Sequence, residues 1–535
     1  MSSRSKVQIY DTTLRDGAQG EGITFSNAAK LKLALRLDAF GVDYIEGGYA
    51  GSNEKDMQFF RDIRRHSLRH ARIAAFGNTR RANTTASDDP QLAQLLDAAA
   101  PVATIFGKTW RLHVRDVLRT TEAENRAMIA DTVRHLKAHD KEVIFDAEHF
   151  FDGYKDSPAF ALKMLHAAAE AGATTVVLCD TNGGSLPQEI FEITGAIRHA
   201  LPAEITLGIH THNDADMAVA NTLEAIRAGA THVQGTINGY GERTGNANLC
   251  SIIPSLALKM GIETVPRAHL AQVRDLARFT DDLVGLRYNT RAPYVGDSAF
   301  SHKGGMHVNA VQKNPRTFEH VPPETVGNVR RILIAETSGT SSVLLKAIEM
   351  GVKLQKGDPE VRELLDALKE LEHKGYTFEA ADASFRMLIQ KVLKRHKSFF
   401  ELEGFRVTVE KQGSDTRSEA AITVRVGKDV EHTVADGDGP VNALDRALRK
   451  ALTRFYPEIA KVALTDFSVR ILDPEEATAA KTRVIIESSD GQATWGTVGV
   501  SGNIIEASWE ALVDSVEYKL FRDEEQRAAG KKSGE

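Results

Sequence analysis

The 535-residue sequence predicts an α/β protein whose N-terminal part, residues 1–261, is a (β/α)₈ barrel. Short apolar runs alternate eight times with segments of helical length over about 250 residues, which is the count and length of such a barrel. Polar residues follow every run, as at the catalytic face of a barrel. An open doubly wound sheet is the alternative, but no G-x-G-x-x-G pattern follows the first run.

The elements of the expected barrel can be read in order along the chain. The expected strands are residues 7–10, 44–46, 73–76, 102–106, 143–145, 175–179, 205–209 and 233–237. The expected helices are residues 27–40, 56–65, 91–99, 122–139, 158–171, 187–199, 216–228 and 247–260. Apolar side chains recur at helical spacing in several of them, as Leu31, Ala34 and Leu35 do. Gly41 and Gly172 follow two of the helices, where a C-terminal cap is expected.

The composition is that of a globular protein with more than one domain. The chain is too long for one ordinary core, so we expect two or three domains. A net charge of −6 provides no electrostatic reason to expect nucleic acid or an anionic membrane as a partner. We find no signal segment and no apolar run that could cross a membrane, and two cysteines are too few for a disulfide framework. These features favour a cytoplasmic protein.

Charged and polar residues gather where each expected strand ends. The first strand leads into Asp11, Arg15 and Asp16. The others lead into Glu46, Asn78, Lys108, Glu148, and the polar stretches 180–183, 210–214 and 238–246. A carboxylate and arginine cluster of this kind can also be a surface turn with an ion pair. Because a barrel brings all eight strand ends to one mouth, we instead expect a single site there.

Two histidines indicate that this site holds a metal ion. His210 and His212 are two residues apart on one expected strand, so both rings point to the same side. An isolated H-x-H is more often structural, but Asp16 would add a carboxylate and Asn246 a carbonyl oxygen. This mixed set suits Mg²⁺, Mn²⁺ or Zn²⁺ acting as a Lewis acid. Open positions on the ion would take the carboxylate and keto oxygens of an α-keto acid.

Three motifs on these strand ends carry a family resemblance. DTTLRDG at 11–17, HTHND at 210–214 and NGYGERTGN at 238–246 resemble the DRE-TIM metallolyase superfamily, in particular its 2-isopropylmalate, homocitrate and citramalate synthases. IEGGY at 45–49, GSN at 51–53 and SHKGGMH at 301–307 resemble the citramalate synthase subgroup. The resemblance extends over nearly the whole chain. Ala18 and Ala50 depart from it, since the family usually has Glu and the subgroup Pro at these positions.

The resemblance implies a role for each candidate residue. It assigns the divalent metal to Asp16, His210, His212 and Asn246. Arg15 would stabilise the enolate and the alkoxide that develop during the reaction, and would contact the substrate together with Thr181 and Glu46. Thr181 would bind the keto-acid carboxylate; its structural alternative is a strand-end cap. Glu148 would lie near the reacting carbon of the acyl-CoA; its alternative is an ion pair. His302, delivered across a dimer interface, is the other candidate for the general base.

The implied reaction is a metal-dependent condensation of acetyl-CoA with pyruvate, followed by thioester hydrolysis, in isoleucine biosynthesis. A 2-isopropylmalate or homocitrate synthase, which takes a larger keto acid, is the first alternative. A metal-dependent carbon–carbon lyase of the same superfamily is the second. Such lyases carry a cysteine in the glycine-rich loop near the end of the barrel, whereas here Cys250 lies beyond that loop.

The rest of the chain predicts linker and regulatory domains. Residues 262–403 are expected to form helical linker subdomains, with helices at 270–284 and 360–374. Residues 404–521 contain an internal βββα repeat, with strands at 405–411, 420–426, 467–472, 483–489 and 495–500 and helices at 441–455 and 504–520. This repeat resembles the regulatory domain of 2-isopropylmalate synthases, which implies a homodimer and isoleucine as feedback effector; a purely structural dimerisation role is the alternative. We expect the charged tail 522–535 to be disordered.

Overall fold

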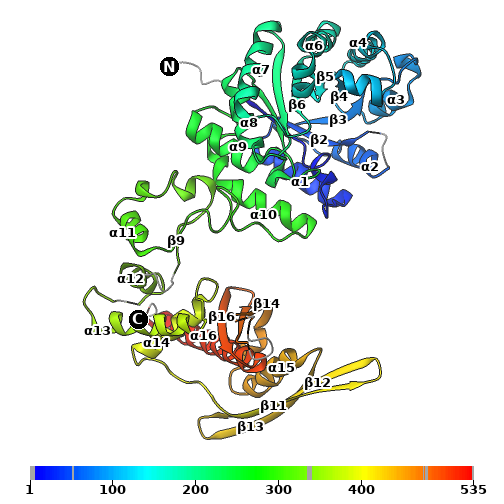
Figure 1. Cartoon of the computed structure of the whole chain (residues 1–535). Helices are drawn as coiled ribbons and strands as arrows, with labels where there is room; N and C mark the ends of the chain where they lie inside the picture. Colours follow the sequence, from blue (N-terminus) through cyan, green and yellow to red (C-terminus); the bar gives the residue numbers. More distant parts are fainter. Residues whose placement is uncertain are drawn as a thin grey trace. The chain divides into compact units, whose positions relative to one another are not determined.

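The computed structural model describes residues 6–50, 54–333, 340–352, 354–473, 475 and 480–532. It divides into two compact units, Met1–Phe300 with His320–Val329, and Ser301–Glu319 with Arg330–Glu535 (Figure 1). The residues expected to form a linker, 262–403, therefore belong partly to each unit. The GSN segment at 51–53 lies outside the described residues.

The first unit is built on a closed barrel of parallel strands. The strands are β1 (Gln8–Asp11), β2 (Tyr44–Tyr49), β3 (Arg72–Asn78), β4 (Val102–Lys108), β5 (Glu142–Glu148), β6 (Thr175–Asp180), β7 (Thr206–Thr211) and β8 (His232–Gly235). Because β1 pairs with both β2 and β8, the sheet closes on itself. This closure confirms the predicted barrel and excludes the open doubly wound sheet.

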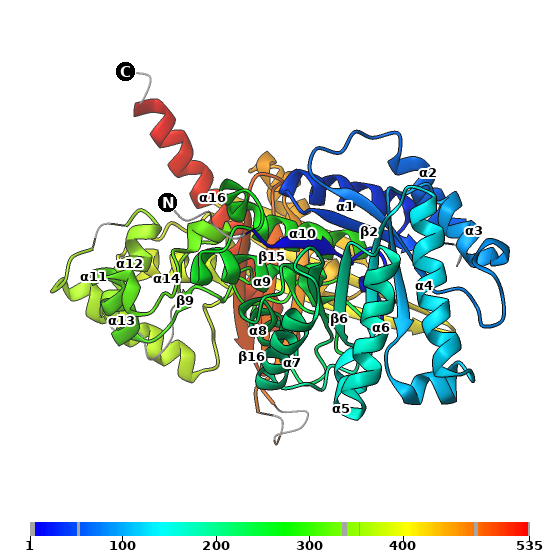
Figure 2. The same cartoon turned by 90° about the horizontal axis from the view of Figure 1, so that it is seen from above.

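Helices cover the outside of the barrel, as both views show (Figure 1, Figure 2). They are α1 (Asn27–Phe40), α2 (Glu54–Ile63), α3 (Pro90–Asp97), α4 (Glu122–Ala138), α5 (Phe150–Asp156), α6 (Pro158–Ala171), α7 (Pro187–Ala200), α8 (Ala218–Arg227), α9 (Leu249–Ser255) and α10 (Val273–Val284). Local chemistry sets their ends. The Ser26 side chain accepts a hydrogen bond from the Ala29 amide at the start of α1, and the helix ends at Gly41, whose φ is 100°.

Two barrel helices begin later than the sequence predicts. The expected helix 216–228 begins at Ala218, because Asp216 has a φ of 58°, which a helix does not allow. The expected helix 247–260 begins at Leu249, since the Asn248 side chain caps it. It continues after Ser255 as a turn of π-helix, Leu256–Met260, next to the helix-breaking Pro254. The late start leaves the preceding glycine-rich stretch as a loop.

The barrel interior contains a histidine without a polar partner. His232 is fully buried, and its ring centroid lies 5.4 Å from that of Tyr10 and 5.6 Å from that of Tyr44. Neither ring nitrogen has a hydrogen-bond partner among the described residues. Burial therefore lowers the pKa of His232 to about 3.

We expect His232 to make the fold sensitive to acid. Between pH 6.5 and about 3 the unfolded chain binds a proton here and the folded chain does not, so the free energy of unfolding falls as the pH falls. The contribution approaches about 1.4 kcal/mol per pH unit. A His232→Leu variant should lose this part of the slope when its melting temperature and that of the unchanged protein are compared from pH 7.5 to 4.5. Parallel pH curves for the two proteins would contradict the expectation.

The second unit contains the predicted repeat. Strands β11 (Glu401–Gln412), β12 (Asp415–Val426) and β13 (Asp429–Gly437) precede α15 (Pro440–Thr453), and β14 (Ala463–Ile471), β15 (Thr482–Ser489) and β16 (Thr494–Ser501) precede α16 (Ile504–Lys532). Each triplet forms its own antiparallel sheet in chain order. Before the repeat lie α11 (Gly305–Lys313), α12 (Thr340–Glu349), α13 (Pro359–His373), α14 (Asp382–Val392) and a parallel pair of short strands, β9 (Ser301–His302) and β10 (Arg331–Ile332).

The end of the chain differs from the prediction of a disordered tail. Helix α16 continues through most of this segment, to Lys532. Ion pairs explain the difference, because Arg522 pairs with Asp490 and Arg527 pairs with Glu458 at 2.7 Å. Charge composition alone predicted disorder because it does not show that folded partners for these charges exist. Among the described residues no helix is both long enough and apolar enough to cross a membrane.

Candidate active site

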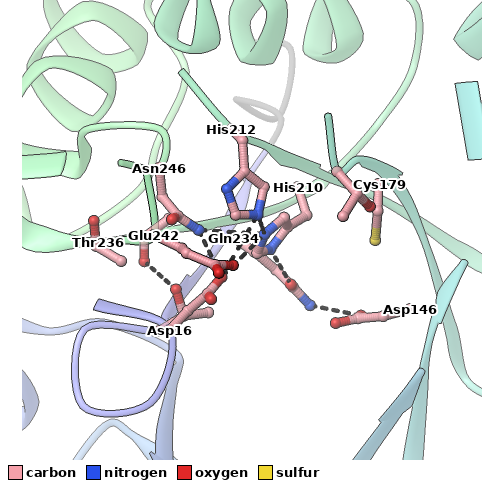
Figure 3. Close-up of polar contacts among 12 residues, drawn as sticks. Asp16, Asp146, Cys179, His210, His212, Gln234, Thr236, Glu242 and Asn246 are labelled. Atoms are coloured by element: carbon pink, nitrogen blue, oxygen red, sulfur yellow. Dashed lines mark hydrogen bonds and ion pairs between the residues drawn. The ribbon is translucent and has the colours of Figure 1, made fainter. Parts of the chain in front are cut away.

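Asp16, His210 and His212 lie together beyond the carboxyl ends of the barrel strands (Figure 3). Asp16 follows β1, His210 lies on β7, and His212 comes directly after β7. The Oδ2 atom of Asp16 is 3.3 Å from Nε2 of His210 and 3.9 Å from Nε2 of His212. All three side chains are buried. The structure thus brings together three of the four residues predicted to bind a metal.

The atoms of this cluster fit a cation. The Nε2 atoms of the two histidines face each other at 3.3 Å, and only one of them can donate a proton in such a contact. The amide nitrogen of Asn246 lies 2.7 Å from Asp16 Oδ2, whereas its buried Oδ1 has no hydrogen-bond partner among the described residues. Exchanging the two amide atoms would direct this oxygen to an ion. One carboxylate, two imidazoles and an amide oxygen suit a divalent metal.

Neighbouring side chains stabilise the ionised form of Asp16. Nη1 of Arg15 lies 3.0 Å from Asp16 Oδ1. Burial alone would raise the pKa of the Asp16 carboxyl, but Arg15 and the two imidazoles together hold it well below its usual range. The Asp16 carboxyl is therefore ionised at neutral pH.

Arg15 is itself fixed by Glu46 on β2. Its Nε donates to Glu46 Oε2 at 2.6 Å, and its Cζ lies 3.7 Å from the ring centroid of Phe76. Tyr10 donates its hydroxyl hydrogen to the other oxygen of Glu46 at 2.8 Å. Glu46 is fully buried and is not among the residues that line the cavity described next. Glu46 therefore fixes the charge and the plane of the Arg15 guanidinium, and its predicted contact with the substrate stays a prediction.

A cavity of about 160 Å³ opens over the cluster. It is lined by Arg15, Asp16, Gln19, Phe76, Phe106, Asp146, Glu148, Cys179, Thr181, His210, His212, Glu242 and Arg243. The lining places the predicted residues Glu148 and Thr181 in the same cavity as the candidate ligands. Its volume is small compared with the few hundred Å³ of pockets that hold drug-sized molecules.

Glu148 and Thr181 are both positioned by backbone and ionic contacts. Glu148 forms an ion pair with Lys108 at the end of the neighbouring strand β4. The hydroxyl oxygen of Thr181 accepts a hydrogen bond from the His149 amide at 2.9 Å. This leaves the hydroxyl hydrogen of Thr181 available to donate to an anion in the cavity.

The loop that carries Asn246 is anchored outside the barrel. The Asn238 side chain donates to Asp281 Oδ1 on α10 at 2.7 Å, and the Tyr240 hydroxyl donates to the same oxygen. Gly241 lies so close to Asn246 that an added Cβ would be 1.9 Å from its Oδ1. These contacts explain why a turn rich in glycine, with one tyrosine, precedes the candidate ligand.

His302 belongs to the second unit, on β9. Its Nε2 lies 3.1 Å from Glu319 Oε1, and Glu319 also accepts from Nε of Arg330 at 2.5 Å. Its part in the reaction stays a prediction.

Sequence reasoning did not give a role to Gln234 or to Lys108. Gln234 on β8 accepts a hydrogen bond from His210 at 2.8 Å between Oε1 and Nδ1, and Lys108 pairs with Glu148. Lys108 is the last residue of β4 and was predicted as a polar strand end. Gln234 lies inside a strand, so only the pairing of β7 with β8, which sets it opposite His210, reveals its role.

The barrel and its buried cluster correspond to a known class of enzymes. The HMGL-like family matches residues 6–279, the homocitrate synthase post-HMGL domain-like family residues 294–376, and the LeuA allosteric (dimerisation) domain residues 379–520. The chain therefore has the HMGL-like barrel of an enzyme that uses a divalent metal, followed by a LeuA-type domain.

Comparison with curated relatives narrows this class. An (R)-citramalate synthase of Geobacter sulfurreducens is 53% identical over 97% of this chain and 99% of its own length. One of Aquifex aeolicus is 51% identical over the same shares. A probable 2-isopropylmalate synthase of Methanopyrus kandleri is 30% identical over 96% of this chain and 98% of its own length. The chain belongs to the (R)-citramalate synthase family.

Proposed function

We propose that the protein condenses acetyl-CoA with pyruvate to form (R)-citramalate and free CoA, a step that feeds isoleucine biosynthesis. The observation that carries this proposal is the identity of 45–53% to five (R)-citramalate synthases over at least 96% of the chain. Relatives named as 2-isopropylmalate synthases are 27–30% identical, so a larger keto acid is the less supported substrate.

Each step of the condensation can be assigned to residues in or beside the cavity. A divalent ion held by Asp16, His210, His212 and Asn246 would polarise the keto group of pyruvate as a Lewis acid. Thr181 donates its hydroxyl hydrogen to the pyruvate carboxylate. A base removes a proton from the methyl group of acetyl-CoA, and that carbon forms a bond to the keto carbon. Water then cleaves the thioester and releases CoA as the thiol.

Arg15 supplies charge stabilisation during this sequence. The enolate of the thioester and the alkoxide of the adduct both develop negative charge, and a fixed guanidinium in a buried site stabilises such charge strongly. Arg15 lines the cavity and is held by Asp16 and Glu46, so it needs no reorganisation when the charge develops. This arrangement supports the proposed role.

We propose Glu148 as the base, because it lines the same cavity as Arg15 and Asp16. A Glu148→Gln variant should lower kcat by about 10²–10⁴-fold, the usual contribution of a positioned general base, with little change in the metal affinity. The matched variant His302→Asn should lower kcat much less. Steady-state CoA release measures both. A larger loss for His302→Asn than for Glu148→Gln would transfer the role to His302.

CoA release also tests the overall function. Free thiol is measured with acetyl-CoA and, in separate reactions, pyruvate, 2-oxoisovalerate or 2-oxoglutarate, with and without a chelator. We expect pyruvate to be preferred by kcat/KM. Preference for 2-oxoisovalerate would indicate a 2-isopropylmalate synthase, and preference for 2-oxoglutarate a homocitrate synthase. Activity that persists in chelator would contradict a metal-dependent reaction.

The identity of the metal is part of the proposal. Asp16 and the amide of Asn246 provide oxygen ligands that favour Mg²⁺ or Mn²⁺, whereas the two imidazoles also suit Zn²⁺. Restoring activity to chelated and dialysed protein with each ion in turn decides between them. We expect Mg²⁺ or Mn²⁺ to restore the highest rate, and a response to Zn²⁺ alone would contradict this choice.

We also propose a homodimer that is inhibited by isoleucine. The match of residues 379–520 to the LeuA allosteric (dimerisation) domain supports both parts. Light scattering of the full chain tests the dimer. CoA release in the presence of isoleucine, leucine and valine tests the effector, and the absence of inhibition by any of the three would contradict the regulatory proposal.

A further inference from the structure

A chain of hydrogen bonds runs from His210 into the barrel (Figure 3). Nδ1 of His210 lies 2.8 Å from Oε1 of Gln234, and Nε2 of Gln234 donates to Oδ1 of Asp146 at 2.9 Å. The three residues come from β7, β8 and β5. Gln234 is fully buried and Asp146 is 4% exposed, where it lines the cavity, so the amide of Gln234 meets only these two partners among the described residues. The Gln234 side chain therefore has few other partners with which it could form hydrogen bonds.

The direction of these hydrogen bonds follows from the carboxylate at their end. An ionised Asp146 can only accept, so the amide nitrogen of Gln234 must face it. The amide oxygen of Gln234 then faces His210 and can only accept. His210 must in turn carry its proton on Nδ1, which leaves the lone pair of Nε2 directed at Asp16, His212 and the centre of the cluster. One buried carboxylate thus determines which nitrogen of His210 is free.

His212 lacks an equivalent arrangement. Its Nδ1 has no hydrogen-bond partner among the described residues, although the ring is as buried as that of His210. Its tautomer is consequently not set by a neighbour in the described part of the chain. The contrast identifies His210 as the histidine whose orientation and protonation are fixed before an ion binds.

We propose that Gln234 and Asp146 are positioning residues that hold His210 in the tautomer able to bind the metal. The inference rests on the proposed metal-dependent function and adds two residues to it. Neither residue binds the ion. Hydrogen-bond partners of this kind usually change metal affinity by about 10–100-fold when they are removed, because they fix the ring and its tautomer.

The neutral amide of Gln234 lies between the His210 ring and the Asp146 carboxylate. Asp146 also lines the cavity, so a carboxylate is kept close to the cluster without touching a ligand. Because Asp146 orients the amide, Gln234 presents an acceptor to Nδ1 of His210. It also separates the negative charge of Asp146 from the imidazole.

A swap of the two side-chain types tests the proposal. In Asp146→Asn the new amide can donate to Gln234, which can then turn and donate to His210, so the fixed direction is lost. In the double variant Asp146→Asn/Gln234→Glu the asparagine donates to the new carboxylate, and that carboxylate accepts from Nδ1 of His210. The double variant therefore restores the direction of the hydrogen bond at His210 and keeps the net charge, while the hydrogen bond between positions 146 and 234 is reversed. A Thr104→Val variant removes another fully buried hydrogen bond of the barrel interior, that to Tyr10, without touching this chain, and is the control.

Calorimetric titration of the metal-free full-length proteins with Mn²⁺ measures the effect directly. The titrations are run at pH 8, because burial raises the pKa of Asp146 to about 7. We expect the dissociation constant to rise about 10–100-fold in Asp146→Asn, to return to within about threefold in the double variant, and to stay unchanged in Thr104→Val. The absorption spectrum of bound Co²⁺ should change and recover in the same order.

The outcomes separate this inference from the proposed function. Unchanged protein that binds neither Mn²⁺ nor Co²⁺ would contradict the metal centre itself. Tight binding by the unchanged protein, with equal binding by Asp146→Asn, would overturn the positioning role alone. A double variant that is folded by circular dichroism but binds no better than Asp146→Asn would overturn it as well.

Discussion

An Asp16→Asn variant is expected to lose metal binding and essentially all CoA release. Asp16 is the one carboxylate of the buried cluster, and its charge offsets the ion that the neutral imidazoles of His210 and His212 would share. An amide in its place provides a weaker oxygen ligand and no charge. We expect kcat/KM to fall by on the order of 10³-fold or more, because both Lewis-acid activation and substrate orientation depend on the ion. Steady-state kinetics and Mn²⁺ titration measure the two effects.

Asp11 provides a matched control in the same segment. It is as buried as Asp16, but its carboxylate accepts from the amide and the hydroxyl of Thr13, at 3.0 and 2.9 Å. Burial raises the pKa of Asp11 to about 7, so part of the folded population already carries a neutral side chain here at neutral pH. An Asp11→Asn variant should keep its Mn²⁺ affinity and most of its activity. Equal losses in both variants would show that the segment, rather than the Asp16 ligand, had been damaged.

Most of the barrel could be predicted because periodicity and turn chemistry are local properties. Each expected strand overlaps an observed one, and two helices, 27–40 and 158–171, have the predicted bounds. The errors arose where a local feature overrode the pattern: the side-chain cap at Asn248 and the positive φ of Asp216. The periodicity of apolar residues does not show which residue caps a helix or adopts a positive φ.

The site was predictable in its residues but not in its connections. The strand ends identified Asp16, His210 and His212, because a parallel barrel brings those ends together. The hydrogen bond of Gln234 and the burial of Glu46 beneath Arg15 depend on register across the barrel interior. The sequence shows on which strand each of these residues lies, but not which side chain of another strand it contacts.

An Arg15→Leu variant is expected to lose both activity and stability, for separate reasons. Removing a preorganised donor that faces developing negative charge lowers kcat by about 10²–10³-fold. The same change leaves Glu46 fully buried without its cationic partner. Breaking one side of a buried ion pair costs about 3–5 kcal/mol of unfolding free energy. Steady-state kinetics with pyruvate and thermal unfolding measure the two losses independently.

The double variant Arg15→Leu/Glu46→Gln separates the loss of activity from the loss of stability. With both charges removed, position 46 no longer carries a buried charge without a partner, and the Tyr10 hydroxyl can still donate to the amide oxygen there. Asp16 loses its contact with Arg15 in the single and the double variant alike. The melting temperature should therefore recover the part of the loss that the unpaired Glu46 causes, whereas kcat should stay as low as in the single variant. Recovery of both would mean that Arg15 acts only by neutralising Glu46. Recovery of stability alone would show that Arg15 contributes to the reaction beyond neutralising Glu46, as expected of a guanidinium that lines the cavity.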